Sequence, residues 1–173
     1  VLPVMKHLPG HGRASADTHH DLPTVTAPAE ELHQTDFAPF RALADLPMAM
    51  TAHIVFAAYD RLPATQSPEM IRVIRDEIGF AGLLLTDDLN MQALAGTLAE
   101  RTARAMAAGC DIALHCKGDL AEMLQVASTA GDMGNATRSR AAAAFARRRP
   151  DAPVDIAGLE AELAAIRPAR LHG

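Results

Sequence analysis

The sequence predicts an α/β fold built on a parallel sheet or barrel, and three features indicate it. Four short apolar runs cover residues 2–5, 48–56, 81–85 and 112–114. They are nearly continuous rather than alternating, as is typical of parallel strands buried on both faces. Helix-like stretches separate them, which is how parallel sheets and barrels are connected. With 173 residues and 49% hydrophobic content, the chain can form one domain with its own core.

The helices between the runs carry start and stop signals. Ser67 and Pro68 suit the N-cap and the first helical position, and Gly79 suits the left-handed residue that ends a helix. Residues 98–108 are alanine-rich and amphipathic, and Gly109 closes them in the same way. Further helices are expected from Pro28, with a break or restart at Pro39, and over residues 120–129, 141–145 and 158–166.

No further strand is predicted beyond about residue 131. The sequence therefore divides into residues 1–130, which hold the β-α units, and residues 131–173, which are expected to form peripheral helices and a tail. Within this second part, the arginines at 147–149 are interpreted as a solvated surface joint.

Composition excludes several classes of partner. The net charge of −5 and the 3% aromatic content argue against nucleic acid, which needs clustered positive charge and stacking surfaces. No apolar run approaches the ~20 residues that cross a bilayer, and no signal-like leader opens the sequence, so no membrane partner is expected. Cys110 and Cys116, if joined by a strand, lie ~20 Å apart, beyond disulfide reach. A reducing compartment is predicted, and a thiolate zinc site is not expected.

Polar residues accompany each apolar run, at the expected carboxyl end of its strand, which is where active sites of parallel α/β folds lie. They are Lys6 and His7, His53, Asp87 and Asp88, and His115. We therefore expect an active-site rim at these strand ends. The pattern alone assigns no role to His53 or His115.

The loop after the first run is the densest in polar groups. Gly10 and Gly12 allow it to fold back over a ligand. The Asp17 carboxylate is placed to hydrogen-bond the His19 imidazole, which would make His19 a usable proton donor and acceptor. Two alternatives are a glycine-rich surface loop with incidental histidines and a metal site. The ligands of that metal site would be His7, His11, His19 and His20.

Asp87 and Asp88 follow the third run, after Thr86. Strand alternation points their side chains in opposite directions, so only one is expected to face a ligand, as a nucleophile or base. The alternative is an N-cap pair for the next helix.

Two of these segments resemble a known family. Residues 6–12 read Lys-His-Leu-Pro-Gly-His-Gly, and Asp17-Thr18-His19 follows; this resembles a loop of the bacterial family 3 glycoside hydrolases, the β-N-acetylhexosaminidases. Residues 86–91 resemble the nucleophile segment of that family. Leu8 stands where the family more often has an aromatic residue. Similarity extends from residue 1 to about residue 130. Within this range, residues 50–55, 62–68 and 79–82 also resemble the family pattern.

The resemblance implies a (β/α)8 barrel of the TIM type. A complete barrel needs ~250 residues, so four β-α units fit about its second half, strands five to eight, followed by C-terminal helices. On this interpretation the N-terminal half, with an acidic and arginine-rich contribution to sugar binding, is absent.

The resemblance also implies residue roles. Asp87 matches the nucleophile, His19 the general acid/base, and Asp17 the residue that polarises it. Lys6 and His7 match groups that bind the sugar. The implied reaction is retaining, through a covalent glycosyl–aspartate intermediate, and it needs no metal or organic cofactor. The implied substrate is a saccharide or muropeptide with terminal β-linked N-acetylglucosamine, handled in the cytoplasm during peptidoglycan recycling.

Two other functions compete with this interpretation. A half-barrel fragment or sugar-binding remnant would not be an enzyme, and it would associate with itself or with a missing N-terminal half. A metal-dependent hydrolase would use the histidine-rich loop, bind zinc and lose its activity to chelators.

Overall fold

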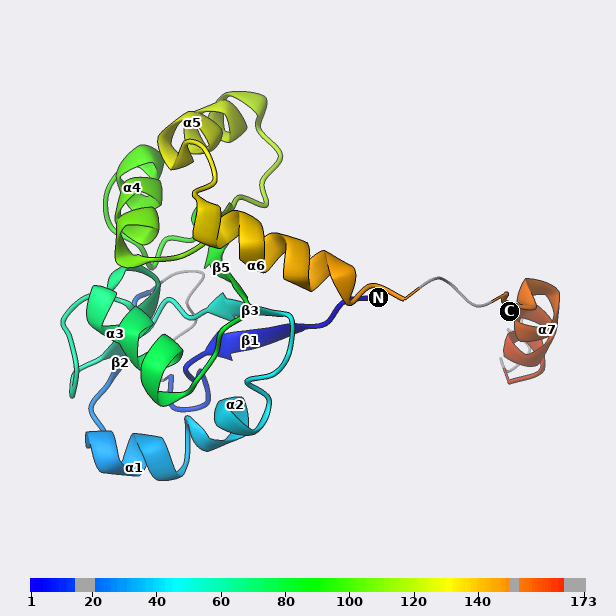
Figure 1. The fold of residues 1–173 in the computed structure, drawn as a ribbon, viewed down its shortest axis with the longest axis horizontal. Coiled ribbons are helices and arrows are strands. Elements are labelled where there is room, and N and C mark those ends of the chain that lie inside the picture. Colours follow the sequence, from blue (N-terminus) through cyan, green and yellow to red (C-terminus); the bar gives the residue numbers. More distant parts are fainter. Residues whose placement is uncertain (15–20, 150–152, 167–173) are drawn as a thin grey trace, which may run out of the picture.

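The computed structural model describes residues 1–14, 21–149 and 153–166. Its centre is a four-stranded parallel sheet made of β1 (Val4–Leu8), β3 (Met48–Thr51), β5 (Leu83–Asp88) and β6 (Ile112–Leu114), shown in Figure 1. The strand order is β1-β3-β5-β6. Each predicted apolar run therefore contributes one strand to this sheet, beside the strand from the next run along the chain, and the prediction of a parallel α/β fold is confirmed.

Two strand boundaries differ from the sequence prediction. The run at 48–56 is divided, because β4 (Val55–Phe56) leaves the main sheet and pairs in parallel with β2 (Thr24–Val25). β2 was not predicted, since two residues carry no periodicity. β5 continues to Asp88, because this residue still pairs with Leu114 of β6. The extension makes both predicted aspartates part of the strand end.

The predicted helices are present with the expected caps. The Ser67 hydroxyl accepts the amide hydrogen of Met70 at 3.0 Å. Gly79 and Gly109 follow helix ends with φ of +83° and +113°, which glycine adopts without a side-chain clash. In the described ranges, no helix is long and apolar enough to cross a membrane. The helical segments are α1 (Ala29–Gln34), α2 (Ala38–Ala42), the 3-10 turn η1 (Ala64–Gln66), α3 (Pro68–Arg72), its π-helical continuation η2 (Val73–Glu77), α4 (Leu98–Ala108), α5 (Leu120–Ala130), α6 (Asn135–Ala146) and α7 (Ile156–Ile166).

The main hydrophobic core lies between the sheet and the segments that connect its strands. Burial of these side chains supplies most of the driving force for folding and holds the strand ends in place. The largest fully buried residues are Phe37, Phe56, Phe80, Leu8, Leu32, Ile54, Met70, Ile74, Ile78, Leu84, Leu89 and Leu94.

The helix α6 packs against the sheet through a few residues, while most of its residues are exposed. It contacts β5, and Figure 1 shows the start of α6 next to this strand. Ala144 is buried, and Arg140 forms a 2.8 Å ion pair with Asp111, which directly precedes β6. This helix is held by contacts with residues much earlier in the sequence. Local periodicity does not reveal such contacts. A domain boundary near residue 130 stays a prediction.

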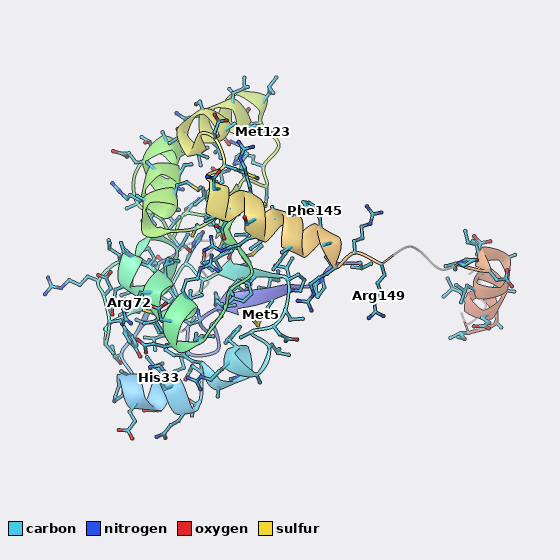
Figure 2. All side chains as sticks on the ribbon, viewed as in Figure 1. Met5, His33, Arg72, Met123, Phe145 and Arg149 are labelled. Carbon is cyan, nitrogen blue, oxygen red and sulfur yellow. The ribbon has the colours of Figure 1, made fainter. Side chains whose placement is uncertain are left out.

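Both edges of the described sheet are open. β1 pairs only with β3, and β6 pairs only with β5. A closed barrel leaves no such edges, because its first and last strands pair. Large apolar side chains are also exposed on the helices: Met123 of α5 is 47% exposed and Phe145 of α6 is 67% exposed (Figure 2). Within the described residues, the sheet is therefore open rather than a closed barrel.

Candidate active site

The carboxyl ends of the strands bring together two of the predicted site residues. His7 lies on β1 and Asp87 lies on β5, with β3 between the two strands. The Nε2 atom of His7 is 3.4 Å from the Oδ2 atom of Asp87. Parallel strands end at the same edge of a sheet, so side chains distant in sequence meet there.

The two oxygens of the Asp87 carboxylate have different surroundings. Its Oδ1 accepts the amide hydrogen of Asp88 at 2.8 Å, whereas its Oδ2 faces His7. The side chain is 15% exposed, which keeps it accessible while removing most of its water. A carboxylate with this geometry can act as a nucleophile or a base.

Next to Asp87, His7 is a neutral imidazole at neutral pH. Burial lowers the pKa of His7, and this effect outweighs the Asp87 carboxylate, which raises it. The exposed Lys6 and the neighbouring His11 lower the pKa of His7 further. The ring centroids of His7 and His11 are 5.5 Å apart. A neutral imidazole at this place can donate a hydrogen bond to a polar ligand or accept one from it.

The neighbouring Asp88 has different partners, as strand alternation predicts. Its Oδ1 accepts the amide hydrogens of Asn90 at 3.1 Å and Cys116 at 3.2 Å. The Asp88 carboxylate therefore joins the chain segments that follow β5 and β6, while the Asp87 carboxylate is directed at β1.

The two remaining strand-end histidines have separate environments. His53 is 0% exposed, and burial is the main reason that its pKa is lowered. The Nε2 atom of His115 lies 3.3 Å from Oε2 of Glu122 on α5, with only 4% of the His115 side chain exposed. Sequence reasoning found both histidines by position but missed Thr65, which hydrogen-bonds His53. The one available signal was that Thr65 lies in the family-like segment 62–68.

Three of the predicted loop residues, Asp17, His19 and His20, lie outside the described residues. The chain that leads to them is anchored by Arg13, whose Nε lies 2.7 Å from Oδ2 of Asp36. The roles assigned to Asp17 and His19 therefore rest on the sequence motif.

The metal hypothesis depends on the same loop. Within residues 1–14, 21–149 and 153–166, no three His, Cys, Asp or Glu side chains gather closely enough to hold a metal ion. Of the four histidines in that hypothesis, His7 and His11 are described and approach each other, and the other two are not described.

Comparison with known proteins gives a consistent result. The family described as "Glycosyl hydrolase family 3 N terminal domain" matches residues 1–148. A curated β-hexosaminidase of Alkalilimnicola ehrlichii is 46% identical over 118 residues, which are 65% of this chain and 34% of that protein. The chain thus spans about a third of the length of the curated relatives it matches.

Two solved structures extend this similarity to three dimensions. A glycoside hydrolase family 3 β-N-acetylglucosaminidase from Paenibacillus sp. superposes with a TM-score of 0.77 and 28% identity, covering 90% of this chain and 34% of that one. NagZ from Neisseria gonorrhoeae, solved in complex with N-trifluoroacetyl-D-glucosamine, has a TM-score of 0.66 and 36% identity, covering 78% of this chain and 40% of that one.

Proposed function

Because the chain belongs to the family of glycosyl hydrolase family 3 N-terminal domains, which are barrels of the TIM type, we propose that it carries the catalytic strand ends of a retaining β-N-acetylhexosaminidase. The observation that carries the proposal is the Asp87 carboxylate at the carboxyl edge of the sheet, with Oδ1 held by a backbone amide and Oδ2 facing His7. The names of the relatives support the class of reaction.

In the first proposed step, an Asp87 oxygen forms a bond to the anomeric carbon as the bond from that carbon to the leaving oxygen breaks. His19 gives its proton to the leaving oxygen, and a covalent glycosyl–Asp87 intermediate results. The low exposure of Asp87 favours attack, because less water must be removed from the carboxylate before it reacts.

In the second step, water attacks the anomeric carbon and His19 takes the proton of that water. Asp87 departs as a carboxylate, and N-acetylglucosamine is released with its β configuration retained. Asp17 would stabilise the His19 cation that forms in this step. Histidine thus takes the place of the second carboxylate that most glycosidases use.

The proposed substrate ends in a β-linked N-acetylglucosamine on a saccharide or muropeptide. Both Lys6 and His7 lie on β1, and His7 lies beside Asp87; their ammonium group and neutral imidazole could hydrogen-bond sugar hydroxyls. The N-acetylglucosamine-like ligand in the gonococcal relative supports this class of substrate. A cytoplasmic role in peptidoglycan recycling is part of the same proposal.

The stereochemistry of the product tests the retaining mechanism. We expect the sugar released from a β-linked substrate to appear first as the β-anomer, because two displacements at one carbon restore its configuration. Proton NMR recorded during the first minutes of turnover, before the anomers equilibrate, measures this. Early α-anomer would exclude a glycosyl–Asp87 intermediate.

The role of His19 has its own test. In His19→Ala, we expect the first step to slow strongly for substrates with a basic leaving group and little for activated aryl leaving groups, which depart without a proton. The measurement is glycosylation rate against leaving-group pKa for wild type and variant. If the slope of rate against leaving-group pKa were the same in wild type and variant, His19 would not be the acid, and His7 or His11 would be assigned that role.

A half-barrel that is not active alone is the second candidate, and the open edges of β1 and β6 favour it. On this hypothesis the 18.3 kDa chain should associate with itself, because pairing covers strand edges and exposed apolar side chains. Size-exclusion chromatography with light scattering measures the mass. A stable monomer that hydrolyses an aryl N-acetyl-β-glucosaminide would contradict this candidate.

A further inference from the structure

The buried His53 belongs to a chain of hydrogen bonds that leads to the proposed nucleophile. Its Nε2 lies 3.0 Å from the carbonyl oxygen of Asp88, and its Nδ1 lies 2.8 Å from Oγ1 of Thr65. The Thr65 Oγ1 is in turn 2.8 Å from Oγ1 of Thr51. His53, Thr65 and Thr51 are all 0% exposed, so bulk water does not compete for these groups.

The Asp88 carbonyl, at one end of this series of hydrogen bonds, determines which atoms carry the hydrogens. A carbonyl oxygen only accepts, so Nε2 of His53 carries a hydrogen and donates it to Asp88. Burial lowers the pKa of His53, so the imidazole is neutral and Nδ1 has a free lone pair. The Thr65 hydroxyl then donates to Nδ1, and the Thr51 hydroxyl donates to Thr65.

One contact competes with this arrangement. The Thr65 Oγ1 also lies 3.0 Å from the carbonyl oxygen of Ala52, and a hydroxyl has a single hydrogen to donate. If that hydrogen went to Ala52, Nδ1 of His53 would need its own hydrogen to reach Thr65, and His53 would be a buried cation. Complete burial of the side chain favours the neutral arrangement.

This series of hydrogen bonds ends at Asp88, which is held through both its carbonyl oxygen and its carboxylate. The carbonyl oxygen accepts hydrogens from Nε2 of His53 at 3.0 Å and from the amide of Met91 at 3.1 Å, and the carboxylate accepts two backbone amides of the following segments. The Asp88 amide is the group that donates to Oδ1 of Asp87 at 2.8 Å. The orientation of the Asp87 carboxylate therefore depends on how firmly Asp88 is held.

We propose that His53 is a positioning residue: held as the Nε2–H tautomer by Thr65 and Thr51, it fixes the Asp88 backbone whose amide orients Asp87 for attack. The inference rests on the proposed role of Asp87 as nucleophile. His53 acts through Asp88, because its own side chain is fully buried.

A matched pair of variants at Thr65 tests the proposal by kinetics. Thr65→Val keeps the shape but leaves Nδ1 of His53 without a donor, whereas Thr65→Ser keeps the hydroxyl. With an aryl N-acetyl-β-glucosaminide, we expect Thr65→Val to lower kcat by ~10²-fold at unchanged KM, and Thr65→Ser to stay within about twofold of wild type. Equal kcat in both folded variants would overturn the proposal, as would a loss confined to KM.

Two NMR measurements on the purified protein decide the same question without turnover. The ¹⁵N shifts of His53 should show a neutral ring with its hydrogen on Nε2; a doubly protonated ring or an Nδ1–H tautomer would overturn the proposal.

Hydrogen exchange of the Asp88 amide should accelerate in Thr65→Val but not in Thr65→Ser. The core amide of Ile78, which donates to the carbonyl of Val73, serves as control for global opening. Unaltered Asp88 exchange in Thr65→Val would also count against the proposal.

The results separate this inference from the proposed function. If wild type releases no N-acetylglucosamine while both NMR results hold, the proposed function fails and the hydrogen-bond chain stands. If wild type is active and the two Thr65 variants match it, the positioning role of His53 fails and the proposed function stands.

Discussion

Replacing Asp87 with alanine is expected to lower kcat for an aryl N-acetyl-β-glucosaminide roughly 10⁴-fold or more, because no covalent intermediate can form. The neighbouring His7 cannot replace the nucleophile, because an imidazole has no carboxylate oxygen to attack the anomeric carbon. Initial rates of aryl release, with circular dichroism to verify the fold, measure the effect. Added azide should restore turnover of the activated substrate in Asp87→Ala, because this small anion can attack from the vacated space.

The adjacent carboxylate provides the matched control. Asp88→Ala should reduce kcat by only about tenfold, because its carboxylate holds the amides of Asn90 and Cys116 rather than facing His7. Azide should not improve Asp88→Ala. A greater loss in Asp88→Ala than in Asp87→Ala would contradict the assignment of the nucleophile.

The largest effect on stability is expected at Asp111, which precedes β6 and is 4% exposed. Its carboxylate forms 2.8 Å ion pairs with Arg75 and Arg140 and accepts the amide hydrogen of Leu84 at 3.0 Å and the hydroxyl hydrogen of Thr137 at 2.9 Å. Asp111 therefore ties β5, η2 and α6 together. Asp111→Ala should lower the free energy of unfolding by about 3–5 kcal/mol, because it leaves a partly buried guanidinium without its counter-charge.

Urea unfolding monitored by circular dichroism measures this loss. Glu69→Ala is the control, since it removes an exposed ion pair with Arg72 and should change stability little. Similar losses in the two variants would show that the Asp111 network adds no more than a surface pair. Arg140→Ala should fall between them, because its own charge is removed together with the contact.

Local chemistry accounts for the parts of the fold that sequence reasoning predicted. The apolar runs became β1, β3, β5 and β6 because buried parallel strands need nearly continuous apolar residues. The ends of α3 and α4 followed from cap residues that act over a single turn, such as Ser67 and Gly109. The candidate site residues Asp87, His7 and Lys6 were predicted in the same way, because a motif and a strand end are both readable along the chain.

The contacts that make the site depend on residues that only folding brings together. The 3.4 Å approach of His7 to Asp87 follows from the order β1-β3-β5, which no local pattern specifies. The chain from Thr65 through His53 to Asp88 joins a 3-10 turn to two strand ends. The sequence by itself therefore determined the four strands of the main sheet and the helix caps, and it predicted which residues carry the chemistry. The partners and orientation of those residues were decided by strand order and long-range packing, since hydrogen bonds and ion pairs require proximity that local periodicity does not encode.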